Sequence, residues 1–391
     1  MVCVIGAVPI SMEKALKKTP SVMNAFTLLR NIEKCSVDTV EDTYNRIVRS
    51  VRTMLKGTIQ AIDSTIIETD PEFPGCGMTK RKKENCNSSS PEYEYIYGFK
   101  LFILYEVKSR IITAMYIVPA NESDHNYFMS LIKQGIRNCG KKQIHTIVAD
   151  RGFLDGGNLW ELKHKLGIDF VIPAKAGMIV REDAIALNEN GDIRARGEWI
   201  YGKGKCKGYG VNYLRSYLEY NRKKVKNNRK TNGSPINAVV VTHWRDKYIS
   251  PDDQVVLLTS LSAEKDVAKI AKIYRLRSLI ENCGFRELKQ ASYLKKLPRR
   301  KGKYVKNAAY IHIMLCVFAH TLFYSFLIWR KRKEPDDCET ICMRSWRRNE
   351  FISSNNKIMI FAENTYYAFF ELDELLDLFG IKQKYRVKMN C

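Results

Sequence analysis

Over its first two-thirds the chain alternates between apolar runs of strand length and stretches with helical periodicity. Runs rich in β-branched and aromatic residues predict strands at 58–69, 94–107, 110–118, 144–150, 169–175 and 255–261. Apolar positions spaced three and four apart predict helices within 11–57, 126–138, 158–167 and 264–290. This order of elements predicts an α/β protein with a mixed sheet flanked by helices.

Two segments interrupt this order. Residues 70–92 are rich in Pro, Gly, Ser and Lys, and we expect them to form a loop. Residues 176–255 are polar, rich in Tyr, Gly and Lys, and patterned as short strands, which predicts a β-rich insertion before the next long helix. The expected organisation is an N-terminal helical region (1–57), a core divided between 58–175 and 256–330, the insertion (176–255) and a C-terminal region (331–391).

The charge of the chain narrows the choice of partner. It has 65 Lys and Arg against 42 Asp and Glu, a formal net charge of +23 over 391 residues. Such an excess favours a polyanion, nucleic acid before an anionic membrane surface. Hydrophobic residues make up 45% of the chain, which excludes a mostly disordered protein. The eleven cysteines are scattered and include no Cys-x-x-Cys pair, so we expect reduced thiols in a cytoplasm.

The segment 308–329 is long and apolar enough to cross a membrane. It contains histidines and hydroxyl residues, however, and basic runs lie on both sides of it. These features favour a helix buried in the protein core, and no membrane partner is expected.

Two aspartates stand where apolar residues are usual. Asp63 interrupts the run AIDSTII, and Asp150 ends the strand IVAD directly before Arg151. Ligands of open α/β sheets bind at the carboxyl ends of strands, which favours a chemical role for Asp150. Each aspartate also has an ordinary structural interpretation, as a surface residue of an edge strand for Asp63 and as a helix cap or turn former for Asp150.

A third group lies on the helix predicted over 264–290. Tyr274, Arg277 and Glu281 follow one another at intervals of three and four residues, which places them on one helix face. A phenol, a guanidinium and a carboxylate together suit a phosphate held beside a metal ion. An Arg–Glu pair at this spacing is also common on solvated helix faces.

The motifs AIDST, PANESDHN, VADRGF and Tyr-x2-Arg-x3-Glu occur in the order found in insertion-sequence DDE transposases. The chain resembles the branch of that family with a Tyr-Arg-Glu-Lys signature, over about residues 20–330. The resemblance implies a ribonuclease H-like core with a β-rich insertion before the last catalytic helix. It also implies that Asp63, Asp150 and Glu281 form the catalytic carboxylate triad.

The chemistry of three carboxylates agrees with that implication. Converging carboxylates repel one another, so their shared ionised state requires cations. Oxygen ligands with open positions suit two Mg²⁺ ions, for which Mn²⁺ can substitute. Two such ions can activate a water or a 3′-OH and stabilise the leaving oxygen of a displacement at phosphorus. The triad residues are therefore expected to be both metal ligands and catalytic residues.

The lysine of the signature departs from the family spacing. It usually follows the glutamate by seven residues, but Leu288 stands at that position and Lys289 comes next. We expect a one-residue bulge near Cys283-Gly284, where glycine tolerates the distortion, to return Lys289 to the catalytic face. A straight helix would leave this role to Arg286 or to no residue.

Basic segments outside this helix are further candidates for DNA contacts. Residues 201–230 hold ten Lys or Arg against the single Glu219 and interleave them with five tyrosines, which fits phosphate contact combined with base stacking. No acid occurs in 289–332. By contrast, we expect 80–83 to be a solvated loop. The residues predicted to bind DNA are Tyr274, Arg277, Lys289, Lys223, Lys224, Lys226, Arg299 and Arg300.

The resemblance predicts a DNA transposase that cleaves transposon ends with Mg²⁺ and joins the freed 3′-OH to target DNA. A homodimer in the end complex and a cytoplasmic, nucleoid-associated location are expected with it. One alternative is a ribonuclease H-like nuclease without strand transfer. Another is an inactive or domesticated DNA-binding protein derived from a transposase, which the 62 residues before Asp63 favour. A third is a membrane protein that uses 308–329.

Overall fold

The computed structural model describes residues 34–83, 92–189, 195–221, 233–292, 294–295, 297 and 305–333, with the strands 350–354, 357–362 and 365–371. The helices expected within 11–33 lie outside these residues. The same is true of five residues predicted to bind DNA, which are Lys223, Lys224, Lys226, Arg299 and Arg300.

Five strands form the core of the sheet in the order β4-β3-β1-β5-β6. They are β1 (Ile59–Glu68), β3 (Tyr93–Glu106), β4 (Ile111–Pro119), β5 (Thr146–Ala149) and β6 (Asp169–Pro173). β1, β5 and β6 run parallel, whereas β3 pairs antiparallel with both β1 and β4. This is the ribonuclease H-like arrangement, and the predicted mixed sheet flanked by helices is confirmed.

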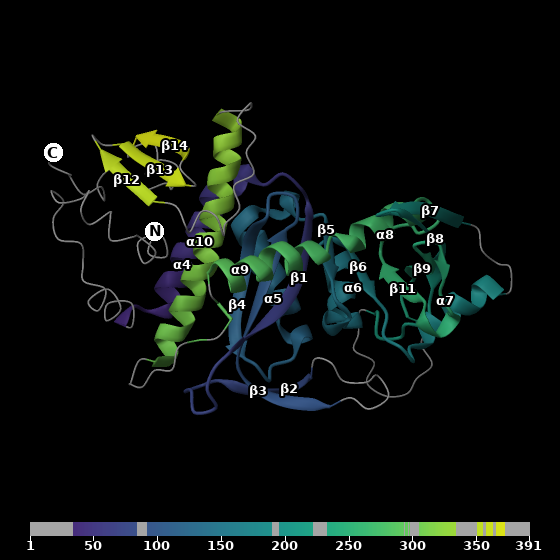
Figure 1. Ribbon diagram of the computed structural model, residues 1–391. Helices are drawn as coiled ribbons and strands as arrows, with labels where there is room; N and C mark the ends of the chain where they lie inside the picture. Colours follow the sequence, from purple (N-terminus) through teal and green to yellow (C-terminus); the bar gives the residue numbers. More distant parts are fainter. Residues whose placement is uncertain are drawn as a thin grey trace.

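Helices cover both faces of the sheet, because the alternation of side chains gives each strand two apolar faces. In β1, Ala61 and Ile67 face one core and Ile62 faces the other. The first core is closed by α8 (Val267–Arg275), α9 (Arg286–Ala291) and α10 (Val305–Lys333), with α4 (Val37–Val51) beside α10. The second is closed by α5 (Asp124–Cys139), α6 (Gly156–His164) and α7 (Ile179–Glu189) (Figure 1).

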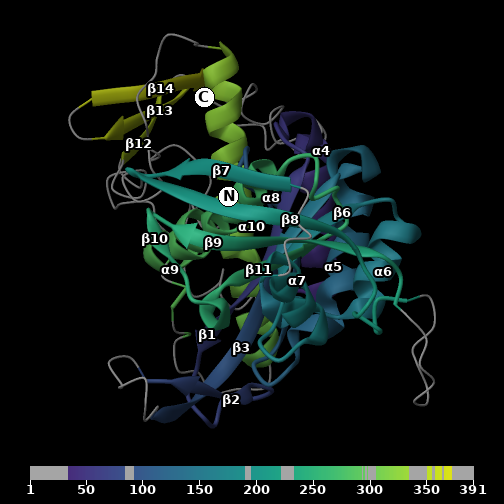
Figure 2. The same ribbon diagram turned by 90° about the vertical axis from the view of Figure 1, so that its right-hand side faces the viewer.

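The insertion continues the core sheet. β11 (Val255–Thr259) pairs antiparallel with β6, and β9 (Ile236–Trp244), β8 (Gly204–Leu214) and β7 (Ala195–Tyr201) follow outward (Figure 2). β10 (Lys247–Tyr248) pairs with β9. Short 3-10 turns lie at Arg52–Met54, Lys141–Gln143, Arg151–Phe153 and Pro251–Asp253. A separate antiparallel sheet contains β12 (Glu350–Ser354), β13 (Lys357–Ala362) and β14 (Thr365–Glu371).

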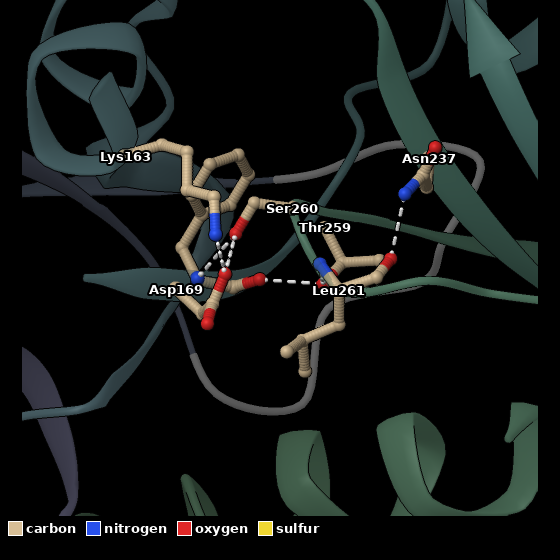
Figure 3. Close-up of polar contacts among 7 residues, drawn as sticks. Lys163, Asp169, Asn237, Thr259, Ser260 and Leu261 are labelled. Atoms are coloured by element: carbon tan, nitrogen blue, oxygen red, sulfur yellow. Dashed lines mark hydrogen bonds and ion pairs between the residues drawn. The ribbon is translucent and has the colours of Figure 1, made fainter. Parts of the chain in front are cut away.

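Polar contacts hold β6 against β11 within the core and join β9 of the insertion to the residues after β11 (Figure 3). Asp169 on β6 accepts hydrogen bonds from Lys163 at 2.5 Å and from Ser260 at 2.7 Å. Thr259 donates to the carbonyl of Phe170 on β6, and Asn237 on β9 donates to the carbonyl of Leu261. The strand ladder and these side chains therefore hold the two parts in one register.

Three expectations from the sequence are wrong in part. The segment 70–92 contains β2 (Gly77–Lys82), which pairs with the first half of β3. The region 176–255 contains the helix α7 besides its strands. The helix expected over 264–290 is divided, because hydrogen bonds of the i→i+3 type tighten the chain after α8 and a π-helical segment η5 (Ile280–Phe285) follows.

The expectation that 308–329 forms a helix buried in the core is confirmed. Among the described residues, α10 is the helix long and apolar enough to cross a membrane, and 67% of its most apolar window is buried inside the protein. His320 on α10 is fully buried and contacts Glu287 of α9 at 3.1 Å. Tyr324 donates to the same carboxylate at 2.6 Å and accepts from Arg110 at 3.2 Å. These contacts attach α9 to α10.

We predict that Tyr324→Phe destabilises the fold, because it leaves Glu287 without its shortest hydrogen bond. The expected loss is about 1–3 kcal/mol in the free energy of unfolding, measured by urea denaturation. Tyr248→Phe is the matched control, since Tyr248 is 64% exposed and the change should stay within about 0.5 kcal/mol. Equal stability of the two variants would show that the Tyr324 hydroxyl does not hold α9 against α10.

Candidate active site

Parallel pairing of β1 with β5 brings the two predicted aspartates together. Ile62 pairs with Ala149, so the next residues, Asp63 and Asp150, are neighbours where β5 ends. Asp63 is not on an edge strand, because β1 lies between β3 and β5. Asp150 precedes a 3-10 turn without capping it through its side chain. The edge-strand interpretation of Asp63 is therefore wrong. Asp150 does begin a turn, because its carbonyl accepts a hydrogen bond from the Phe153 amide, but its side chain does not cap that turn.

Arg277 connects Asp63 to Glu281. Its Nη1 atom lies 3.0 Å from Asp63 Oδ2 and 2.8 Å from Glu281 Oε1. The side chains of Asp63 and Arg277 are 14% and 18% exposed, whereas Glu281 is 51% exposed. One guanidinium thus joins a nearly buried strand carboxylate to a carboxylate at the surface.

Burial dominates the electrostatics of this group. It raises the pKa of Asp63 to about 7, an effect that Glu281 and Asp150 reinforce and that the Ser64 amide and Arg277 oppose. Burial lowers the pKa of Arg277, but its hydrogen bond with Glu281 and the charges nearby outweigh this, so Arg277 remains a cation. Burial also raises the pKa of Tyr274, which Arg277 opposes through its charge and a side-chain hydrogen bond. Tyr274, Arg277, Glu281 and both aspartates therefore form one interacting group.

The expected bulge in the catalytic helix is confirmed. Residues Ile280–Phe285 form a π-helical segment that contains both Cys283 and Gly284. Lys289 is half-buried, and burial lowers its pKa, while Glu68 at the end of β1 opposes this change. Arg286 is exposed. After the π-helical segment, Lys289 therefore lies near the Glu68 end of β1, whereas Arg286 faces solvent.

Residues 55–319 match the model of a family described as the transposase DDE domain. The matched range covers about two-thirds of the chain and includes the aspartates, Glu281 and Lys289. The chain belongs to the transposase DDE domain family.

Outside this family model, similarity is weaker. A solved structure of the piggyBac transposase synaptic complex with hairpin DNA matches with 12% sequence identity and a TM-score of 0.42. The match covers 76% of this chain and 53% of that chain, so this family member spans about half the length of the piggyBac transposase chain. No curated protein matches the sequence.

The donor set of this DDE domain suits a divalent cation by its chemistry, because Asp63, Asp150 and Glu281 offer only oxygen ligands. As the side chains stand, no three His, Cys, Asp or Glu in the described part of the chain could hold one ion. Arg277 lies between Asp63 and Glu281 and contacts both carboxylates. A metal bound jointly by these two carboxylates would therefore compete with Arg277 for their charge.

Most tyrosines of the insertion do not form the expected stacking surface. Tyr209, Tyr217 and Tyr220 are buried, with at most 4% of each exposed. Tyr213 is 72% exposed. The ring of Tyr201 lies 3.5 Å from the guanidinium of Arg275, so it attaches the insertion to α8 of the DDE domain.

A second polar group beside the aspartates was missed from the sequence. Lys100 of β3 donates to Asp124 at 2.9 Å, and Asp124 also lies 3.5 Å from the hydroxyl of Ser64. A Cβ atom at Gly152 would lie 2.9 Å from a carboxylate oxygen of Asp124, so a larger residue there would displace this side chain. Asp124 belongs to the motif PANESDHN, which was the available signal, but its role depends on a lysine from a distant strand.

We predict that replacing Arg277 with Gln changes the response of this DDE domain to metal. Without divalent ions, Arg277→Gln should lower the melting temperature, because Asp63 and Glu281 lose their shared counter-charge. Addition of Mg²⁺ should raise the melting temperature of this variant more than that of the wild type, since no guanidinium competes for the carboxylates.

The matched control is Arg275→Gln, because Arg275 stacks on Tyr201 and, in the part of the chain that the structure describes, makes no ion pair with the carboxylates. Its Mg²⁺-dependent shift should equal that of the wild type. Equal shifts in all three proteins, measured by differential scanning fluorimetry, would contradict competition between Arg277 and a cation.

Proposed function

We propose that the chain is a DNA transposase that cleaves phosphodiesters at transposon ends and joins the freed 3′-OH to target DNA. The observation that carries this proposal is the convergence of Asp63, Asp150 and Glu281, which come from two parallel strands and the helix beyond the insertion. Membership of the transposase DDE domain family supports the same reaction class.

Asp63, Asp150 and Glu281 are the residues that would hold Mg²⁺, two ions in the proposed state, with Mn²⁺ as a substitute. The bound ions supply positive charge for the leaving oxygen and lower the pKa of the attacking water. When Asp63 and Glu281 turn toward cations, Arg277 is released to contact a phosphate of the DNA. Lys289 is proposed to contact a second phosphate, and Tyr274 to pack against the terminal nucleotide.

The reaction comprises two displacements at phosphorus. In the first, a water oxygen forms a bond to phosphorus and the bond to the 3′ oxygen breaks, which leaves a 3′-OH and a 5′-phosphate. In the second, that 3′-OH forms a bond to a phosphorus of the target DNA, and a target 3′ oxygen leaves. In each step the attacking oxygen loses one proton and the leaving 3′ oxygen gains one, so no oxidant or reductant is needed.

The remaining expectations belong to this proposal. The basic residues Lys223, Lys224, Lys226, Arg299 and Arg300 would contact the DNA backbone. Two copies of the chain would hold the two ends of one element, as a homodimer associated with the nucleoid in the cytoplasm. Contacts with both transposon ends and target DNA agree with the net charge of +23.

One observation favours a second candidate function, a DNA-binding protein without catalysis. Arg277 pairs with both Asp63 and Glu281. A protein that keeps these pairs would bind DNA through its basic surface and leave the phosphodiesters intact. The same experiment separates the two functions.

We predict that Asp63→Asn, Asp150→Asn and Glu281→Gln each abolish Mg²⁺-dependent cleavage, with a loss of at least about a thousandfold, while DNA affinity stays within about threefold. Each change removes a metal ligand and no phosphate-binding cation. The assay is nicking of a supercoiled plasmid that carries both flanks of the element, followed by strand transfer of a pre-cleaved 3′-OH end.

Asp252→Asn is the control, because Asp252 is an exposed carboxylate in the turn before β11. It should cleave like the wild type. Cleavage without strand transfer in the wild type would indicate a nuclease, and DNA binding without cleavage would indicate the second candidate. Nicking retained by one triad variant would remove that residue from the catalytic site.

A further inference from the structure

The ribbon formed by β2 and the first half of β3 extends beyond the end of β1. β1 ends at Glu68, which pairs with Gly98 of β3, and residues 93–98 of β3 pair with β2. Both views show this ribbon at the lower edge of the molecule (Figures 1 and 2). The sequence pattern did not predict this ribbon, and the function proposed above assigns it no role.

One face of the ribbon is aromatic and basic. Met78 pairs with Tyr97 and Lys80 pairs with Tyr95, so these side chains share a face with Tyr93. Tyr95 is 63% exposed, Tyr93 is 49% exposed and Met78 is 48% exposed. The amino group of Lys80 lies 4.3 Å from the centre of the Tyr93 ring.

On the opposite face of the ribbon, the charged side chains form ion pairs with one another. Arg81 lies 2.8 Å from Glu68 and 2.7 Å from Glu94, so the three side chains form an internal network. Within the described residues, Lys80 makes a cation–π contact and no ion pair. The two faces of the ribbon therefore differ in net charge, and the excess of positive charge lies on the tyrosine face.

The tyrosine face lies on the same side of the sheet as the catalytic carboxylate. Ile103 of β3 pairs directly with Asp63, so their side chains point to the same side. Tyr95 and Tyr93 are eight and ten residues away from Ile103, and an even separation keeps them on that side. At a rise of about 3.3 Å per residue, Tyr95 lies about 26 Å along the strand from Asp63. That distance corresponds to about eight base pairs of duplex.

We propose that this ribbon face contacts the backbone of double-stranded DNA about eight base pairs from the reacting phosphate. The proposal rests on the function proposed above, which places DNA at Asp63. Lys80 supplies the charge, and the hydroxyls of Tyr93 and Tyr95 donate hydrogen bonds to phosphates. Exposed lysine on an edge strand disfavours the addition of another protein strand, which makes DNA the better occupant.

The test measures the affinity of the full chain for a 40-base-pair duplex of arbitrary sequence without divalent metal, by fluorescence anisotropy across a salt series. Lys80→Glu should lower the affinity at least about fivefold at 100 mM salt and reduce the slope of log affinity against log salt by about one. Tyr95→Ala should lower the affinity about threefold or more. Lys80→Gln provides a milder second variant if the charge reversal disturbs folding.

Lys142→Glu is the matched control. Lys142 is exposed in the turn before β5, at the end of that strand opposite Asp150, and the same charge reversal should change affinity less than twofold. Equal affinity and slope for Lys80→Glu, Lys80→Gln and the wild type would overturn the proposal. A change in sedimentation with unaltered DNA affinity would show that a second copy of the chain occupies the face, and would also overturn it.

The two proposals fail separately, because binding is measured without metal and cleavage with it. If the wild type cleaves DNA but Lys80→Glu binds normally, the ribbon proposal is wrong and the proposed function stands. If Lys80→Glu weakens binding but the wild type never cleaves, the ribbon proposal stands and the catalytic function is wrong.

Discussion

Like charges brought together by the fold must be balanced, and the cation that balances Asp63 and Glu281 here is Arg277. Its guanidinium spans the gap between a central strand and the helix segment that follows the insertion. Without a positive charge at this point, a buried aspartate beside two other carboxylates would favour protonation or separation. The same contact fixes the helix against the sheet. In the proposed function, each member of this ion pair would exchange partners on binding metal and DNA.

The irregular helix serves this geometry. The i→i+3 hydrogen bonds that follow α8 form narrow helical turns, which include Arg277. The π-helical segment that comes next forms a wider turn, which includes Glu281. The contacts of Glu287 with His320 and Tyr324 then attach α9 to the buried helix α10. An added Cβ at Gly284 would meet Ile103 and Tyr105 at ordinary contact distance, so packing alone does not require glycine at this position. The spacing between Glu281 and Lys289 indicated the bulge, because it is one residue longer than the family spacing and a wider helical turn accommodates the extra residue.

Sequence periodicity was sufficient to predict the strands whose side chains alternate between the two cores. β1, β3, β5 and β6 were predicted for this reason, and α5 from its helical periodicity. The proximity of Asp63 and Asp150 was implied by the resemblance to DDE transposases, and parallel pairing of β1 with β5 accounts for it. β2 was missed because its residues are mostly charged and small, and its strand structure depends on pairing with β3. The contact of Arg277 with Asp63 and that of Lys100 with Asp124 join residues far apart in the chain, which a linear pattern does not encode.

The continuous sheet has a mechanical consequence. β11 pairs with β6 on one side and with β9 of the insertion on the other, so the insertion continues the sheet of the core. The contacts of Asp169, Thr259 and Asn237 reinforce this connection, which contains no hinge in this described part of the chain. Rotation of the insertion toward the carboxylates would require these hydrogen bonds to break. In the function proposed above, a duplex that contacted both parts would have to fit this fixed arrangement by bending. Its sequence-dependent flexibility would then contribute to selectivity at base pairs that the protein does not touch.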